Sequence, residues 1–341
     1  MSGPRGSIID VHAHLLPEVA WNIPTASGML RMTEHGDGIH LGATPIAVGR
    51  TALSDPRAML DDMDRAGIDV RVVSPPPYAF PLDAAEPEAT EYCALVTDAL
   101  VDACRIDPAR LIPVGIVPLR TVTGAEAAMT LLAATGARGV AVPPIIDGSP
   151  LGQGVGRGVL AAAARAGLPV LVHPVQAARP ELATHYLRNL IGNPYETSVA
   201  IASCALSGVL DEIPALRILF VHAAGGAPMI VGRWDHGWRN RPDVGDVGAR
   251  APSETLLDRV FVDALAHHPG AARLSEEIFG REAMTLGSDY PFDMGDPDPI
   301  RSARQAGMDE SALSRNAWRW LGEEMPDTRI HATAGALDSK V

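Results

Sequence analysis

The sequence predicts an α/β fold, a distorted (β/α)8 TIM barrel with an insertion after the first strand. Short apolar runs rich in β-branched residues alternate with segments of helical period from about residue 55 onward. Eight such runs occur along the chain, which is the number of strands in a closed barrel of this class. Four of the runs lead directly into a histidine or an aspartate, and catalytic groups in these barrels lie where the strands end.

The predicted strands follow one another along the chain, with helices between them. The first helix begins at Asp55-Pro56, where a capping residue precedes a proline in the first turn, and it ends at Gly67. The strands are predicted at 8–11, 69–73, 111–117, 139–142, 169–173, 217–222, 259–262 and 283–287. The other helices are predicted near 88–107, 122–135, 157–167, 195–213, 226–239 and 270–280.

Residues 17–53 interrupt this alternation with glycine, proline, threonine and polar residues, so they are predicted to form an insertion that overhangs the barrel mouth. The chain of 341 residues fits one barrel with insertions, because about 250 residues is usual. We therefore expect a single domain over residues 1–341 with its core at about 7–322. The polar tail after Pro326 is expected to be poorly ordered.

The composition limits the classes of function. Hydrophobic residues make up 47% and charged residues 20%, which supports a large core and excludes overall disorder. A formal net charge of −13 argues against binding to nucleic acid or to an anionic membrane surface, since phosphate affinity comes mainly from lysine and arginine. No apolar run approaches the roughly 18 residues of a membrane span. Three cysteines at no ligand spacing fit a reducing cytoplasm.

The first apolar run ends in His12-Ala-His14. Side chains two residues apart on a strand point to the same face, so both imidazoles can reach one metal ion. Asp10 shares that face two residues deeper, so we expect it to support the ligands or line the barrel interior, with direct ligation held in reserve. A structural strand with two exposed histidines is the alternative for this motif taken alone.

Three further runs end in residues that bind metals. Leu168-Pro-Val-Leu-Val leads to His173, Leu216-Arg-Ile-Leu-Phe-Val leads to His222, and Ala283-Met-Thr-Leu-Gly-Ser leads to Asp289. A hydrogen-bonded core histidine or a helix-capping aspartate would explain any one of them. Together they predict convergence on one metal at the barrel mouth, although spacing alone does not separate a ligand from an acid/base role for His222.

These motifs resemble the amidohydrolase superfamily. More narrowly, the chain is similar to the branch that contains α-amino-β-carboxymuconate-ε-semialdehyde decarboxylase (the ACMSD-like, amidohydrolase 2 branch) and related nonoxidative decarboxylases. The resemblance is carried by Asp-x-His-x-His at the first strand, His-Pro at the fifth, the segment His222–Arg233, Arg239-Asn-Arg-Pro, Phe261-Val-Asp-Ala and Ser288-Asp-Tyr-Pro-Phe.

The resemblance implies that His12, His14, His173 and Asp289 hold one divalent metal ion, zinc in the first place with manganese as the alternative. It also implies that His222 is the catalytic acid/base, with Asp289 catalytic as well as a ligand. Three imidazoles and one carboxylate leave an open coordination position, as a catalytic site needs. A water molecule on such a metal has its pKa lowered to about 7, so activated water is expected.

The resemblance further implies an active homodimer, in which Arg233 reaches the neighbouring active site and binds a substrate carboxylate. An arginine of the family on the first insertion aligns with Ala47 here. Either Arg50, three residues on, replaces it and binds substrate, or that contact is missing. Phe292 is expected to present a flat surface to a conjugated substrate. Val175 and Gln176 follow the His-Pro pair where the family decarboxylase has a tryptophan and an acidic residue, which leaves the substrate open.

The predicted function is metal-dependent nonoxidative decarboxylation of a small conjugated or aromatic carboxylic acid. A metal-dependent hydrolase of an amide, lactone or ring C–C bond in aromatic-compound catabolism is the alternative, because one superfamily supports both reactions. A noncatalytic ligand-binding barrel that keeps its metal for stability is a further alternative. No dinucleotide or phosphate-binding glycine motif occurs, so no organic cofactor is expected.

Overall fold

The computed structural model describes residues 7–36, 38–245 and 250–323. Eight parallel strands form the barrel, in a sheet of three with the order β1-β6-β7 and a sheet of five with the order β14-β13-β12-β11-β8. Their bounds are β1 Ile9–His14, β6 Val70–Ser74, β7 Leu111–Pro113, β8 Val140–Val142, β11 Val170–Val172, β12 Ile218–Phe220, β13 Phe261–Asp263 and β14 Met284–Thr285.

Backbone hydrogen bonds join the two sheets at both seams and so close the cylinder. At one seam the Val11 amide donates to the Leu286 carbonyl at 2.9 Å, and Asp10 forms a parallel β-bridge with Leu286. At the other, the Gly115 amide donates to the Gly139 carbonyl at 3.0 Å, beside a parallel bridge between Gly115 and Val140. The predicted α/β barrel is therefore confirmed, and each of the eight strands overlaps its predicted range.

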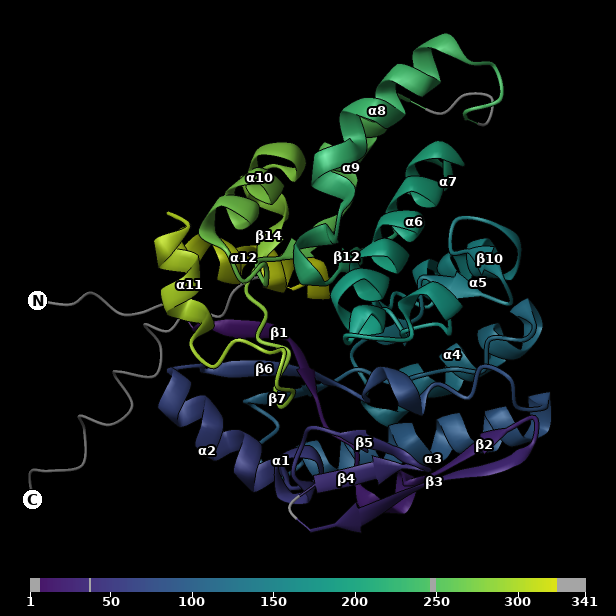
Figure 1. Ribbon diagram of the computed structural model, residues 1–341, viewed down its shortest axis with the longest axis vertical. Helices are drawn as coiled ribbons and strands as arrows, with labels where there is room; N and C mark the ends of the chain where they lie inside the picture. The colour runs from purple at the N-terminus through teal and green to yellow at the C-terminus, as the bar shows by residue number, and fades with distance from the viewer. Residues whose placement is uncertain (1–6, 37, 246–249, 324–341) are drawn as a thin grey trace, which may run out of the picture.

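Helices surround the barrel, as the helical period predicts (Figure 1). Helix α2 begins after Asp55, whose side chain accepts a hydrogen bond from the Arg57 amide, and it ends at Gly67 in the left-handed conformation. The α-helices are α1 Arg50–Ser54, α2 Pro56–Ala66, α3 Glu86–Cys104, α4 Val122–Thr135, α5 Gly154–Arg165, α6 Asn193–Leu206, α7 Val209–Glu212, α8 Ala227–Asn240, α9 Pro252–Arg259, α10 Pro269–Phe279, α11 Pro299–Gln305 and α12 Glu310–Leu321.

Short elements connect these helices and strands. They are the 3-10 turns η1 Glu18–Ala20, η2 Pro77–Ala79, η3 Pro180–Leu182, η5 His222–Ala224 and η6 Arg281–Ala283, the π-helical turn η4 Arg188–Gly192, and the hairpin of β9 Ile145–Ile146 with β10 Ser149–Pro150.

Three features differ from the sequence prediction. The predicted helix 195–213 is two helices, α6 and α7, because Gly208 between them has a positive φ of 72° and breaks the helical path. The predicted strand 111–117 ends its regular ladder at Pro113. Helices α1, α9, α11 and α12 were not predicted, and the tail after Pro326 lies outside the described residues.

The predicted insertion forms an antiparallel sheet of four strands, β2 Asn22–Thr25, β3 Gly28–His35, β4 Gly38–Leu41 and β5 Thr44–Ile46. It lies at one end of the molecule beside α3 (Figure 1). The Tyr92 hydroxyl of α3 donates to the Ala20 carbonyl at 2.8 Å, which ties the insertion to the barrel helices. No helix among the described residues is long and apolar enough to cross a membrane.

Candidate metal centre and active site

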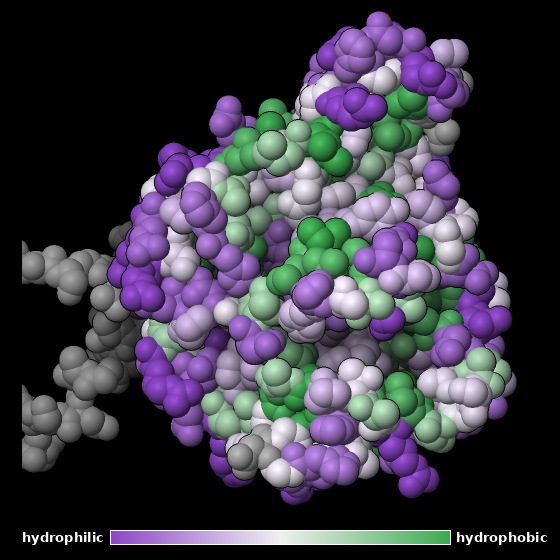
Figure 2. All heavy atoms as spheres, viewed as in Figure 1, coloured by the Kyte–Doolittle hydropathy of each residue, from purple (hydrophilic) through white to green (hydrophobic). Residues whose placement is uncertain are grey.

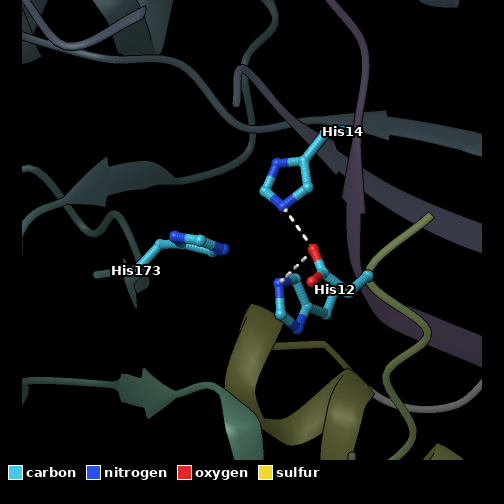
Figure 3. Close-up of side chains that lie close together, drawn as sticks. His12, His14 and His173 are labelled. Atoms are coloured by element: carbon cyan, nitrogen blue, oxygen red, sulfur yellow. Dashed lines mark hydrogen bonds and ion pairs between the residues drawn. The ribbon is translucent and has the colours of Figure 1, made fainter. Parts of the chain in front are cut away.

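Four side chains from three strand ends converge at the mouth of the barrel. His12 and His14 lie on β1, His173 follows β11, and Asp289 follows β14. One ligand atom from each lies within 4.8 Å of all the others, and all four residues are buried. In Figure 3 the rings of His12, His14 and His173 turn toward a common point. The structure therefore brings the four predicted metal ligands together.

The carboxylate of Asp289 lies close to three histidines of the site. Its Oδ1 lies 3.0 Å from His14 Nε2 and 3.3 Å from His12 Nε2, and its Oδ2 lies 3.6 Å from His222 Nε2. The backbone sets this position, since the Asp289 amide donates to the His12 carbonyl at 2.7 Å. One carboxylate thus faces three imidazoles contributed by two other strands.

The residues fit a divalent cation. His173 Nε2 is closed off from solvent and has no hydrogen-bond partner within the described part of the chain. A buried polar atom without a partner costs about 1–3 kcal/mol, so a cation that accepts its lone pair removes that penalty. Three nitrogens and one carboxylate oxygen form a donor set that zinc and similar divalent metals bind in proteins.

The electrostatics keep two imidazoles in the form that binds metal. Burial lowers the pKa of His14, and burial together with the neighbouring histidines lowers the pKa of His173 well below its usual 6.5. Neutral imidazole is the ligand form. Burial by itself raises the pKa of Asp289, but His12 and the hydrogen bonds from the cluster outweigh it and hold that pKa well below 3.8. The carboxylate is therefore ionised.

His12 lies between two carboxylates that favour positive charge. Burial by itself lowers its pKa, but Asp289 and Asp263 outweigh burial and raise the pKa of His12 to about 10. The same two carboxylates would favour a bound metal cation at this position. We therefore expect metal binding to displace the proton of His12.

Asp263 orients the His12 ring and was missed by the sequence analysis as a site residue. Its Oδ2 lies 2.7 Å from His12 Nδ1, and its Oδ1 accepts the amides of Ala223 at 2.9 Å and Leu265 at 3.1 Å. The Nδ1–H of His12 then points at Asp263 and Nε2 at the cluster. The sequence feature that could have identified Asp263 is its position, as an acidic residue at the end of the seventh apolar run.

The other two rings are fixed by neutral acceptors. His173 Nδ1 lies 2.7 Å from the Pro174 carbonyl. His14 Nδ1 lies 3.2 Å from Ser74 Oγ and 3.3 Å from the Pro75 carbonyl. Each contact leaves Nε2 as the atom that faces the cluster, so the three histidines are oriented before any metal binds.

Asp263→Asn is expected to lower metal affinity by about 10- to 100-fold, because the amide no longer accepts a charge-assisted hydrogen bond from His12. Competition with a metal chelator measures this, and thermal unfolding checks the fold. The exposed Asp83→Asn is the matched control and should leave affinity unchanged. Equal affinities for Asp263→Asn and the wild type would contradict an orienting role.

Asp10 is a support for the strand ends, and direct ligation is not its role. Its Oδ1 accepts the amides of His12 and Ser288, both at 3.0 Å, and its Oδ2 accepts from Arg71 Nε at 2.9 Å and from Ser288 Oγ at 2.6 Å. These contacts engage both carboxylate oxygens, and Asp10 is not part of the compact ligand group. Asp10 therefore links β1 to the turn that carries Asp289.

His222 stands beside the four ligand atoms without belonging to that compact group. It begins a tight turn in which His222, Ala223 and Ala224 all have φ between 50° and 65°. Such positive φ values cost energy for residues other than glycine and are concentrated at functional sites. Its side chain is 16% exposed, and its Nε2 faces Asp289. The acid/base role of His222 stays a prediction.

The predicted substrate-binding residues lie in three different places. The Phe292 ring lies 5.3 Å from the His14 ring, centroid to centroid, beside the metal ligands. Arg50 lies on the insertion side, where Glu18 at 2.6 Å and Glu34 at 3.3 Å hold its guanidinium. Arg233 is exposed on α8. The guanidinium of Arg50 thus pairs with two carboxylates of the same chain, and substrate binding by Arg50 stays a prediction.

Known proteins resemble this chain over nearly its whole length. It is 25% identical over 331 residues to a 2-amino-3-carboxymuconate-6-semialdehyde decarboxylase of Dictyostelium discoideum, covering 93% of this chain and 92% of that protein. The fold is similar to that of 5-carboxyvanillate decarboxylase LigW from Sphingomonas paucimobilis, with a TM-score of 0.76 at 19% identity, covering 94% and 100% of the two chains.

A second solved structure with the same fold is a dihydroxybenzoic acid decarboxylase from Polaromonas sp. JS666 with bound manganese and the inhibitor 2-nitroresorcinol. Its TM-score is 0.71 at 17% identity, over 93% of this chain and 97% of that chain. The model of the family described as amidohydrolase matches residues 9–324. By this match, and with the metal-binding cluster at the strand ends, the chain belongs to the amidohydrolase family.

Proposed function

We propose that this protein is a metal-dependent nonoxidative decarboxylase of a small conjugated or aromatic carboxylic acid. The observation that carries the proposal is the group of His12, His14, His173 and Asp289 with His222 beside it, at the C-terminal ends of the barrel strands. The similarity to a carboxymuconate semialdehyde decarboxylase over 93% of the chain supports the same reaction class.

For the metal we propose zinc, with manganese as the alternative. Three imidazole nitrogens suit zinc. Manganese is the alternative because the dihydroxybenzoic acid decarboxylase of similar fold has manganese bound. Elemental analysis of the purified protein decides between them, and about one equivalent per chain is expected. A location in the cytoplasm is also part of the proposal, supported by three cysteines that are all free and buried.

The proposed reaction breaks the bond between the substrate's carboxylate and its carbon skeleton. The pair of electrons stays on the ring or conjugated carbon, CO2 leaves, and a proton takes its place. A divalent cation would supply a positive centre that binds substrate oxygens and stabilises the negative charge of this step. His222 would deliver the proton, since it borders the cavity and its Nε2 faces the cluster.

An assay of CO2 release tests the proposal against the hydrolase alternative. The metal-loaded protein is incubated without oxygen with a panel of hydroxybenzoates and carboxymuconate semialdehydes. We expect CO2 in equal amount to the decarboxylated product, and none after removal of the metal with a chelator. Release of an amine or of a second acid without CO2 would favour the hydrolase. Stabilisation by metal with no turnover of any substrate would favour a binding protein.

We propose that the active unit is a homodimer in which Arg233 enters the active site of the neighbouring copy. Two features support this. Arg233 is exposed on α8, and the C-terminal end of that helix stands out from the barrel in Figure 1. The guanidinium makes no ion pair within the described residues, so it is available to a substrate carboxylate.

Arg233→Ala is expected to raise KM for the substrate by about 30-fold, because a desolvated carboxylate loses its charged partner, at a cost of at least about 2 kcal/mol. Steady-state kinetics measures the change, and thermal unfolding should be unaltered. Arg239→Ala on the same helix is the matched control. Mixing Arg233→Ala with His222→Ala should restore activity, since hybrid dimers contain one complete site. Unchanged kinetics in Arg233→Ala would remove this residue from the site.

A further inference from the structure

The cavity that reaches the metal-binding cluster is walled mainly by apolar side chains. It has a volume of about 530 Å3 and is lined by His222 and Asp289 together with apolar residues such as Leu190, Met229 and Leu274. Figure 2 shows hydrophobic side chains around a hollow in the region where Figure 1 places α6, α8 and α10. In such a cavity the few polar groups fix the orientation of a ligand.

Asn193 is a buried polar residue of the cavity wall that the fold itself does not use. Only 6% of Asn193 is exposed, and its Oδ1 is closed off from solvent with no hydrogen-bond partner among the described residues. Two other polar lining residues are engaged: Ser275 Oγ donates to the Ala223 carbonyl at 2.9 Å, and His268 Nδ1 accepts from the Gly270 amide at 3.0 Å. The Asn193 carboxamide is therefore left for a ligand.

Hydrogen bonds from the N-terminal part of α6 fix Asn193 beside the loop after His173 and the turn after His222. Glu196 accepts the amides of Val175 at 2.9 Å and Ala177 at 2.6 Å, which fixes the loop after His173. Ser198 Oγ accepts the Gly226 amide at 2.9 Å and donates to the Pro194 carbonyl at 2.6 Å, which fixes the turn after His222.

A tight backbone contact reinforces this arrangement. A Cβ atom added at Gly225 would lie 2.4 Å from the Pro194 carbonyl oxygen, so the turn after His222 packs directly against the residue that follows Asn193. Because the backbone at Asn193 is held on both sides, its side chain has a defined position relative to His222. A hydrogen bond to a bound molecule would need little further ordering.

We propose that the Asn193 carboxamide binds a hydroxyl or amino substituent of the substrate and thereby decides which carboxylic acid the site accepts. The inference rests on the proposed function, since it takes the substrate to be a carboxylic acid bound in this cavity. The O–H or N–H of the substituent would donate to Oδ1, the atom that lacks a partner. An acid without that substituent would leave the buried acceptor unpaired.

Calorimetric titration of the metal-loaded protein tests the proposal without requiring turnover. The probes are benzoate and its 2-, 3- and 4-hydroxy and amino derivatives. We expect the wild type to bind at least one derivative roughly 5-fold or more tightly than benzoate. In Asn193→Leu, which keeps a similar volume without a polar group, this ratio should fall to about one, whereas benzoate binding changes little.

Three comparisons make the result decisive. Asn193→Ala removes the same group without added bulk, so it replaces the leucine variant if that one fails to fold or to bind metal. Asn189→Leu, on the same cavity wall but only partly buried, should keep the preference. A wild type with no preference, or a preference that survives in the folded Asn193 variants, would overturn the proposal. Failure of CO2 release alone would instead count against the proposed reaction.

Discussion

His222→Ala is expected to retain its metal and to lose at least about 100-fold in kcat, since general acid/base catalysis contributes about 10²–10⁴-fold. The metal should remain because the compact ligand group consists of His12, His14, His173 and Asp289 and leaves His222 outside. Turnover should fall because Nε2 of His222 faces the cluster and borders the cavity. Elemental analysis and steady-state kinetics on the same preparation measure both quantities.

The exposed His35→Ala on the insertion sheet is the control for His222→Ala, and it should change neither metal content nor kcat. The His222→Ala variant separates the two roles that spacing left open for this residue, metal ligand and acid/base. If His222→Ala is purified without metal under conditions that load the wild type, this histidine is a ligand. If it binds metal and turns over at the wild-type rate, another group supplies the proton.

Asp289→Asn is expected to lose both the metal and the activity. Its carboxylate contacts His12 and His14 directly and faces His222, so removal of the negative charge takes away the only anionic donor of the ligand group. Asparagine is preferred over alanine here, because Asp289 has a positive φ of 58° that asparagine tolerates better. The change then tests charge without added backbone strain.

Added metal should raise the melting temperature of the wild type and not that of Asp289→Asn, because a ligand that binds only the folded state stabilises it by mass action. Asp293→Asn, an exposed carboxylate in the same loop, is the matched control and should behave as the wild type. A full complement of metal in Asp289→Asn at wild-type affinity would contradict the assignment of this ligand.

The sequence by itself determined the order of the eight barrel strands and the candidate residues of the metal centre. Strand and helix patterns are local, and side chains two apart on β1 share a face whatever the rest of the chain does, so His12 and His14 could be paired from their spacing. The rule that strand ends meet at one face of a barrel added His173, His222 and Asp289. The insertion 17–53 was also predicted, since it breaks a regular alternation.

Only the tertiary structure decided how these groups are used. Asp263 reaches His12 across 251 residues of sequence, and Arg50 pairs with Glu18 and Glu34. The unpaired carboxamide of Asn193 is visible only once its surroundings are known. The physical reason is that hydrogen-bond partners and burial depend on packing between distant segments, whereas periodicity and spacing report only on neighbours along the chain.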